Sequence, residues 1–349
     1  MTNPIFTGLW GNLHIQGIAV DQKNGYIYYS FTTKLVKSRL DGEIVGTVDG
    51  LMGHLGCIAF NESDGKVYGS LEYKNDKIGQ GILASLGRSV ALENAFYIAI
   101  FDVDKIVRCD MSAEADGIMK CVYLKEVVDD FSGAGRDLDG RTVPHKYGCS
   151  GIDGTTFAPL VGGSAEDGMY LYVAYGVYSD HNRSDNDHQV LLCYDVRGWG
   201  DIARPLNQCD MHTNGPDKPL KKLFVYTGNT TYGVQNLEYD KNKNALFMAV
   251  YRGSKPEFPN YALFIADMSN PSEKRELTGI GEIGETIQLL KLGEGVGEIY
   301  GWNFPYGSTG LYSYGDGRWL ISHNGVRDGE QFSRIFAYKW DDSKGFLKQ

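Results

Sequence analysis

The sequence predicts an all-β fold made of many short antiparallel strands. The chain of 349 residues contains 45 glycines, which divide it into short segments. It also contains 23 tyrosines and 15 phenylalanines, and aromatic side chains fit the pleated, half-buried surface of a sheet. Because 42% of the residues are hydrophobic, the chain can bury a substantial core. We therefore expect short strands separated by frequent turns along the whole chain.

One stretch of the sequence occurs nearly twice. HIQGIAVDQKNGYIYYS begins at His14, and HLGCIAFNESDGKVYGS begins at His54. After His14, four apolar segments of strand length follow within about forty residues, separated by turns such as QKNG and DG. This spacing is typical of a four-stranded antiparallel blade, and a second blade is expected to begin at His54.

Three later segments keep the same pattern, namely KYGCSGIDGTTF, YGVQNLEYDKNKNALFMAVY and STGLYSYGDGRWLISHNG. The five segments align on a polar residue at the first turn, and these residues are Asp21, Asn61, Asp153, Asp240 and Asp316. Blades are therefore expected to open near residues 14, 54, 146, 233 and 309, so that residues 1–349 form one domain. We expect the N-terminal PIFTGLW to close the ring, because closure removes exposed sheet edges.

Through GIAVD…NGYIYYS and CIAFN…DGKVYGS, the sequence resembles the β-propeller superfamily, in the loose way shared by its NHL, SMP-30 and streptogramin-lyase-like members. The resemblance covers nearly the whole chain and implies an architecture. Together with the five segments, it gives a five-bladed β-propeller of four-stranded antiparallel blades as the predicted fold. The activity stays open, because propellers include hydrolases, lyases, oxidoreductases and binding platforms.

Composition excludes several classes of function. The formal net charge is -10, and no cluster of Lys and Arg suits a nucleic acid. No apolar run is long enough to span a bilayer, and MTNPIFTGLWGN lacks the features of a secretory signal, so a cytoplasmic location is expected. The six cysteines lie in apolar segments that resemble strands, and they are expected to be buried, reduced thiols. Nucleotide-binding glycine motifs are missing from the sequence, so no nucleotide cofactor is expected.

Histidines at equivalent positions suggest a site on the propeller axis. The first strand of each blade lines the central channel, so His14 and His54 are expected to face the same mouth. His145 and Gln235 stand within two residues of the corresponding positions in two later blades. Such a cluster suits a divalent transition metal with an open position, and the resemblance adds that some propeller uronate lyases use such a centre. The alternative is structural, with each histidine hydrogen-bonding a neighbouring blade.

Other side chains near the channel are candidates for catalysis or substrate binding. Tyr147 and Tyr232 open two blades, and a phenol beside a histidine can donate a proton, although such tyrosines also pack between blades. Asp153 and Glu238 lie on or beside channel strands, where burial would raise the pKa of a carboxyl. At Asp153 a turn is the competing explanation.

Two loops provide further candidates. The rings of Trp302, Phe304 and Tyr306 in GWNFPYGS could form a stacking wall for a sugar or belong to the core. The insertion YSDHNRSDNDHQV carries oxygen ligands at spacings that suit calcium, and it could equally be a solvated polar loop. Its candidate ligands are Asp180, Asn182, Asp185 and Asp187.

Two classes of function remain open. The first is a carbohydrate-active enzyme, a lyase or hydrolase, acting on a saccharide or another small molecule at the channel mouth. Its candidate residues are His14, His54, His145, Gln235, Tyr147 and Tyr232. The second is a non-catalytic platform that binds a ligand or a protein through the insertions of the middle blades. Nothing in the sequence indicates the oligomeric state.

Overall fold

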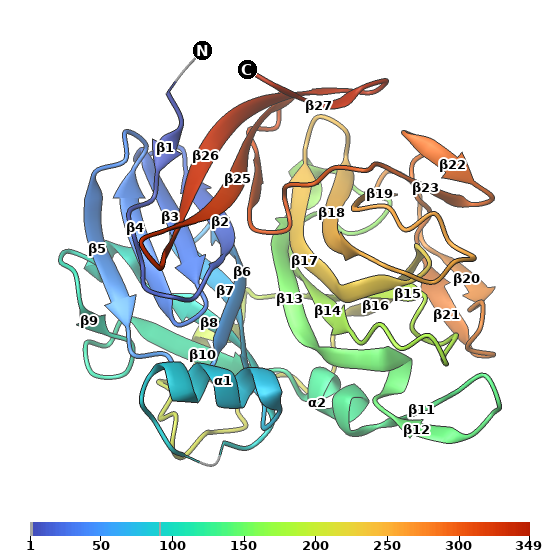
Figure 1. Ribbon diagram of the computed structural model, residues 1–349, viewed down its shortest axis with the longest axis horizontal. Helices are drawn as coiled ribbons and strands as arrows, with labels where there is room; N and C mark the ends of the chain where they lie inside the picture. The colour runs from blue at the N-terminus through green and yellow to red at the C-terminus, as the bar shows by residue number, and fades with distance from the viewer. Residues whose placement is uncertain (1–2, 91) are drawn as a thin grey trace.

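The computed structural model describes residues 3–90 and 92–349, and five sheets follow one another around a central axis (Figure 1). The predicted five-bladed propeller is confirmed. Each blade begins with the strand nearest the axis, and these strands are β2 (Ile15–Asp21), β6 (His54–Asn61), β13 (Cys149–Ala158), β17 (Thr230–Asp240) and β24 (Leu311–Ser313). Each of the five contacts the next, and β24 contacts β2, which closes the ring.

The blades hold between three and six strands rather than four each. Blade 1 continues outward from β2 with β3 (Tyr26–Phe31), β4 (Lys34–Arg39), β5 (Ile44–Asp49) and β9 (Met111–Ser112). Blade 2 adds β7 (Lys66–Tyr73), β8 (Ala95–Phe101) and β10 (Met119–Tyr123) to β6. Blade 3 adds β14 (Tyr170–Val177), β15 (His188–Tyr194), β16 (Lys221–Tyr226), β21 (Ile283–Thr286) and β20 (Glu273–Glu276) to β13.

The last two blades differ most from the repeat. Blade 4 adds only β18 (Ala245–Arg252) and β19 (Leu263–Asp267) to β17. Blade 5 consists of β24, β25 (Arg318–Arg327), β26 (Glu330–Asp341), β27 (Gly345–Lys348) and β1 (Ile5–Phe6). In this blade the N-terminal β1 pairs with the C-terminal β26, with Ile5 opposite Ile335. The first and last parts of the chain therefore share one sheet.

The insertions carry the short helices and two hairpins. The helices are α1 (Lys77–Ser85), α2 (Lys125–Ser132) and α3 (Trp199–Ile202), with 3₁₀ turns η1 (Val103–Lys105), η2 (Lys146–Gly148) and η3 (Ala165–Asp167). The hairpins are β11 (Ala134–Arg136) with β12 (Thr142–Pro144), and β22 (Glu294–Val296) with β23 (Ile299–Gly301). Helix α1 begins after Asp76, whose carboxylate accepts hydrogen bonds from the backbone of Ile78 and Gly79. Within the described part of the chain, no helix is long and apolar enough to cross a membrane.

The two copies of the repeated stretch form the same turn between their first two strands. Gly25 donates its backbone N–H to the carbonyl of Asp21, and Gly65 does so to Asn61, both at 2.9 Å. Both glycines have positive φ, 73° and 69°, a conformation that side chains with a Cβ rarely adopt. The Asp21 and Asn61 side chains also accept backbone N–H groups within the turn. The polar residue and the glycine of QKNG and ESDG thus fix the hairpins that start blades 1 and 2.

The serine that ends each copy connects its blade to the next one. Ser30 in β3 donates to the carbonyl oxygen of Gly56 in blade 2 at 2.7 Å. Ser70 in β7 donates to the carbonyl oxygen of Asp153 in blade 3 at 2.6 Å. Both hydroxyls are buried, where an unmade hydrogen bond costs about 1 to 3 kcal/mol. The repeat is therefore explained in part by contacts between blades.

The hydrophobic core lies between neighbouring blades rather than at the axis. Five clusters of buried side chains fill the five interfaces, including the one between blades 5 and 1. Between blades 4 and 5, for example, the rings of Phe247 and Trp319 lie 4.5 Å apart. Burying a large apolar side chain contributes about 1.5 to 3 kcal/mol, so each interface stabilises the ring substantially.

The cysteines form no disulfide in the described part of the chain. Four of them are buried as expected, namely Cys57, Cys121, Cys149 and Cys193. Cys109 and Cys209 are exposed, so the expectation of buried thiols is wrong for these two. Both lie in connecting segments rather than in strands, and a connecting segment has no sheet face to bury.

Candidate active site

Side chains from several blades meet at one mouth of the channel. His14 lies one residue before β2, and His54 is the first residue of β6. Asp153 comes from β13 and Gln235 from β17. The positions of His14 and His54 follow from the repeat, because equivalent positions of neighbouring blades approach the axis together. His14 is close enough to His54 to lower the pKa of the His54 ring.

Asp153 lies inside a strand, so the turn interpretation of this residue is wrong. The pairing of β13 with β14 is irregular between Ile152 and Thr155. Such an irregularity changes the direction of a side chain, which then departs from the regular alternation between the two faces of the sheet. Oδ1 of Asp153 lies 3.9 Å from Nδ1 of His54, and Oδ2 accepts a hydrogen bond from Nε2 of Gln235 at 3.1 Å. Asp153 therefore connects the histidine of blade 2 with the glutamine of blade 4.

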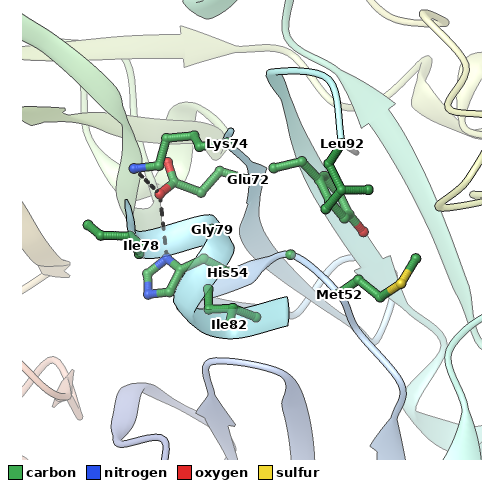
Figure 2. A pocket seen from close by; sticks show the side chains of 10 residues that line it. Met52, His54, Glu72, Lys74, Ile78, Gly79, Ile82 and Leu92 are labelled. Atoms are coloured by element: carbon green, nitrogen blue, oxygen red, sulfur yellow. Dashed lines mark ion pairs between the residues drawn. The ribbon is translucent and has the colours of Figure 1, made fainter. Parts of the chain in front are cut away.

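Glu72 is a second carboxylate beside the His54 ring. It lies opposite His54 in the β6–β7 hairpin, and its Oε1 atom is 3.7 Å from Nδ1 of His54 (Figure 2). Both carboxylate distances are too long for direct hydrogen bonds, and the buried Nδ1 atom has no partner among the described residues. A cavity of about 10 Å³ lies beside His54 and Glu72. It has room for about one water, which could bridge these groups.

Lys74 neutralises Glu72 and attaches this strand to blade 3. Its Nζ atom lies 2.6 Å from Oε1 of Glu72 and donates to the carbonyl oxygen of Ser150 at 2.9 Å. The backbone N–H of Ile152 donates to Oε2 of Glu72 at 3.1 Å. Glu72 and Lys74 are only 5% and 6% exposed. A buried charge needs such partners, because desolvation without them is expensive.

Two glycines make room for the carboxylates. A Cβ atom on Gly151 would lie 2.0 Å from Oε2 of Glu72, and φ at Gly151 is +127°. A Cβ atom on Gly56 would lie 2.4 Å from Oδ1 of Asp153. Any larger residue at either position would displace one of the two acids. The backbone is thus shaped to hold both carboxyl groups beside His54.

The environment sets a specific protonation pattern. Burial raises the pKa of Asp153 well above its ordinary value, and the Glu72 carboxylate raises it further. Burial also raises the pKa of Glu72, but the Lys74 ammonium acts against this. Burial lowers the pKa of His54 to about 3, with smaller contributions in the same direction from Lys74 and His14. Burial therefore favours the protonated form of Asp153 and a neutral ring of His54, whereas the Lys74 ammonium favours the charged form of Glu72.

Polar side chains surround this group at the mouth. The backbone carbonyl of Tyr232 accepts a second hydrogen bond from Gln235 at 3.1 Å. The Tyr232 ring is 48% exposed and packs edge-on against Tyr251 at 6.4 Å. On the blade 1 side, Gln16 lies 3.2 Å from Nε2 of His14 and donates to Thr32. The open surface of the mouth is therefore rich in hydroxyl, amide and imidazole groups.

His145 does not join the predicted histidine cluster. Its Nδ1 atom lies 2.6 Å from the carbonyl oxygen of Phe131, and its ring packs between Phe131 and Tyr178. It precedes η2 with φ at 69°, so the chain turns there before β13 begins. Among the described residues, no three His, Cys, Asp or Glu side chains are arranged to hold a metal ion.

Tyr147 is also placed away from the mouth. Its side chain is buried, and its hydroxyl donates to Glu282 at 2.9 Å. The ring packs against Phe224 and lies under the ammonium of Lys222. Tyr147 therefore has the packing role that the sequence left as its alternative.

The predicted substrate-binding residues lie in three different places. Gln235 is at the mouth, whereas Glu238, three residues further along β17, lies toward the other end of the channel and contacts Ser313 and Thr156. Trp302 pairs with Leu263 outside the channel and packs against Trp340. Tyr306 stacks on His323 at 3.6 Å. The structure does not bring Trp302 and Tyr306 into contact with His54.

The acidic loop of blade 3 directs its carboxylates to protein cations. The expected calcium ligands were the side chains of Asp180, Asn182, Asp185 and Asp187. Asp185 pairs with Arg183 at 2.8 Å, and Asp187 pairs with the buried Lys255 at 2.6 Å. The Asp180 carboxylate accepts the backbone N–H of Asn182. Arginine and lysine thus occupy the positions where calcium would bind two of these acids.

Sequence reasoning missed Glu72 and Lys74, although the repeat contained a signal. Glu72 corresponds to Thr32 of blade 1, because Ser30 and Ser70 occupy equivalent positions in the two copies. The hairpin register places Glu72 opposite His54, so a carboxylate beside the repeated histidine could have been found by pairing the strands. Pairing the two strands in this register would have predicted that blade 2 contributes a carboxylate to the mouth.

Comparison with known proteins gives only distant similarities. No family model matches the chain, and no curated protein matches it. One similar solved structure is a functionally unknown protein from Desulfotomaculum acetoxidans, with 11% identity, a TM-score of 0.36 and coverage of 96% of this chain and 68% of that one. Another is a gluconolactonase from Xanthomonas campestris, with 11% identity, a TM-score of 0.33 and coverage of 96% and 95%. These identities and TM-scores are too low to assign the activity of either protein to this chain. The function is therefore inferred from the geometry of the site.

Proposed function

We propose that this protein is a carbohydrate-active enzyme, a lyase or hydrolase, that uses acid–base catalysis at the His54 mouth of the channel. One observation carries the proposal: His54 and Asp153, whose pKa values burial shifts in opposite directions, lie within 4 Å of each other at a mouth formed by several blades. Pairs of titratable groups whose environments shift their pKa values in opposite directions are typical of acid and base roles.

His54 is the base in this proposal. Its Nδ1 atom faces Glu72 and Asp153, while among the described residues none is hydrogen-bonded to Nε2. Because the ring is neutral, the Nε2 lone pair can accept a proton from the substrate or from a water molecule. The Glu72 carboxylate, 3.7 Å from Nδ1, orients the ring. Glu72 is therefore a positioning residue.

Asp153 is the acid. Burial raises its pKa and so favours the protonated form, and Gln235 holds one of its oxygens at 3.1 Å. In a lyase reaction, Nε2 of His54 takes the proton next to a uronate carboxylate, a carbon–carbon double bond forms, and the leaving sugar oxygen takes the Asp153 proton. In a hydrolase reaction, His54 activates a water molecule and Asp153 protonates the leaving oxygen. In both cases a proton returns from His54 to Asp153 through solvent.

The surface of the mouth supports a polyhydroxylated substrate. Tyr232, Tyr251, Gln235 and His14 provide hydrogen-bonding groups at the rim. The half-exposed ring of Tyr232 offers an aromatic face of the kind that sugar rings stack on. A saccharide is thus matched by both the polar groups and the aromatic ring.

The test is an activity screen with matched variants. Uronate-containing oligosaccharides and sugar lactones are incubated with the protein, and a lyase is recognised by the ultraviolet absorbance of its unsaturated product, a hydrolase by acid release without it. We expect H54A and D153N to lower kcat by about 100-fold or more, and H181A and D139N, which change exposed residues, to leave it unchanged. Absence of turnover on both substrate classes, or full activity in D153N, would overturn the proposal.

A non-catalytic platform is the second candidate, and the Glu72–Lys74 network favours it specifically. The same contacts that surround His54 also join β7 to β13, so the cluster can serve as a connection between blades 2 and 3. In that case D153N and H54A would change the free energy of unfolding without any effect on a reaction. Chemical denaturation of both variants, measured beside the activity screen, separates the two candidates.

A further inference from the structure

A second cavity lies at the opposite mouth of the channel. It has a volume of about 680 Å³ and is lined by residues from the ends of the innermost strands of all five blades. These include Ile18, Ile58, Thr156, Glu238 and Tyr312. The volume is within the range of about 300 to 1,000 Å³ typical of small-molecule sites. The cavity is separate from the His54 mouth, because Cys57 and Asn236 fill the axis between them.

Glu238 is the partly buried acidic group of this cavity, whereas Glu62 lies exposed at its border. Glu238 has no cationic partner in the described part of the chain. Its Oε1 atom accepts the backbone N–H of Ser313 at 2.8 Å, and its Oε2 atom lies 3.4 Å from the hydroxyl of Thr156. Two contacts leave part of the acceptor capacity of a carboxylate unused. The side chain is partly exposed, and the surface that it contributes lines the cavity.

The walls around Glu238 are aromatic. The rings that line the cavity are those of Phe60, Phe157, Tyr170, Tyr239, Tyr312 and Tyr314. Tyr312 and Tyr314 pack edge to face at 5.3 Å. The two basic residues at the border are already paired, Lys241 with Glu166 at 3.0 Å and Arg197 with Asp195 at 2.8 Å. Around Glu238 the cavity therefore combines aromatic faces with a carboxyl group that lacks a countercharge, and the exposed Glu62 adds a second carboxyl group at the border.

We propose that this cavity binds a small organic ammonium compound, with its nitrogen at the Glu238 carboxylate and its carbon skeleton among the aromatic rings. Aromatic faces attract a cation through the ring quadrupole, and the attraction strengthens when the cation is desolvated. A carboxylate in the same enclosed space supplies the opposite charge. A neutral polyol would use the hydroxyl of Thr156 but would gain nothing from the charge. The proposal does not depend on the reaction at His54.

Binding should depend on pH in a defined direction. Burial raises the pKa of Glu238 to about 8, with a further contribution from Asp240 in the same strand. Burial raises the pKa values of the neighbouring Tyr312 and Cys57, so they stay neutral, and it also raises those of Tyr239 and Tyr314. The exposed Glu62 at the border of the cavity is a further carboxyl group. An ammonium ion binds the ionised carboxylate, which is scarce below about pH 8. Affinity should therefore rise by nearly tenfold from about pH 6 to about pH 7 and by about fivefold more from about pH 7 to about pH 8.

The experiment is calorimetric titration of the full chain with hexylammonium and with 1-hexanol, which has a similar shape but no charge. We expect hexylammonium to bind at least about tenfold more tightly than 1-hexanol at pH 8, and E238Q to remove this preference. E43Q, which changes an exposed glutamate of blade 1, and D153N at the other mouth should bind like the unaltered protein.

Several results would overturn the inference. Equal affinities for hexylammonium and 1-hexanol would mean that the cavity recognises only the alkyl chain. Unchanged hexylammonium binding in E238Q, no binding of hexylammonium at all, or an affinity that does not rise with pH in the unaltered protein would each be incompatible with an ammonium site at Glu238. Because loss of activity in D153N concerns the opposite mouth, failure of either proposal leaves the other measurable.

Discussion

Asn236 and Cys57 meet on the propeller axis, with Oδ1 of Asn236 3.5 Å from Sγ of Cys57. The Asn236 amide donates to the carbonyl oxygens of Gln16 at 2.8 Å and Ser308 at 2.9 Å, and Sγ of Cys57 lies 3.4 Å from the carbonyl oxygen of Thr155. Since these partners come from blades 1, 3 and the start of blade 5, one small polar group connects all the blades. It also divides the channel into its two mouths.

Substitution N236L should destabilise the ring. It leaves two buried carbonyl oxygens without their donors, so we expect the free energy of unfolding to fall by about 1 to 3 kcal/mol. Urea denaturation followed by tryptophan fluorescence measures this. The matched change N324L, at an exposed position of β25, should stay within about 0.5 kcal/mol. Equal stability of N236L and the unaltered protein would mean that Asn236 does not hold the blades together.

The Glu72–Lys74 pair should behave as a coupled unit. E72Q leaves the buried Lys74 ammonium without its carboxylate, and K74M leaves Glu72 without its cation, so each is expected to cost about 3 to 5 kcal/mol. The double variant E72Q/K74M removes both charges and should cost clearly less than the sum of the two. A double-mutant cycle from denaturation curves measures the coupling. Additive effects would show that the two charges do not stabilise each other.

The pH dependence of stability should report His54. Its pKa falls from an ordinary 6.5 to about 3 on folding, so the unfolded chain binds a proton that the folded ring does not. Stability is therefore lost as pH decreases from about 6.5, by up to about 1.4 kcal/mol per pH unit. H54Q should remove this part of the acid sensitivity. Denaturation curves at about pH 4 and about pH 6 give the free energy of unfolding of H54Q and of the unaltered protein. The same decrease between these pH values in both proteins would contradict the lowered pKa of His54.

Asp153 should change the pH dependence of stability in the direction opposite to His54. Because its pKa is higher in the folded state, the folded chain binds the additional proton, and stability is lost as pH rises above the ordinary value of 3.8. D153N carries no titrating group and should lack this loss, so its stability relative to the unaltered protein should increase with pH. Thermal melts across the neutral range measure this difference. D139N, on an exposed loop, is the control.

Calcium should have little effect on the acidic loop of blade 3. The carboxylates of Asp185 and Asp187 already bind Arg183 and Lys255, so a calcium ion would have to displace two buried cations. We expect the melting temperature to be the same in millimolar calcium and in chelator. A rise with calcium that the chelator reverses would show binding, since a ligand of the folded state stabilises by mass action.

The sequence was sufficient to predict the ring of blades, since the information is local. QKNG and ESDG determine their hairpins through a polar residue and a glycine with positive φ, and each hairpin needs only a few consecutive residues. Repetition of that unit then implies stacking of equivalent faces, so the sequence alone predicts that His14 and His54 lie at one mouth. Both β2 and β6 are buried along nearly their whole length, as innermost strands between neighbouring blades.

Only the tertiary structure decided which groups complete the site and which strands complete the blades. From the sequence, Asp153 is interpreted as a turn residue. In the structure, the irregular register of β13 directs its side chain toward His54. His145 stands near the right sequence position, but the turn before β13 carries its ring to Phe131. β9 and β21 join blades 1 and 3 through parallel pairing with strands remote in sequence. The edge of a sheet has unpaired backbone groups and can pair with any strand that lies beside it. Which segment lies there depends on the packing of the whole chain, and no local sequence pattern indicates it.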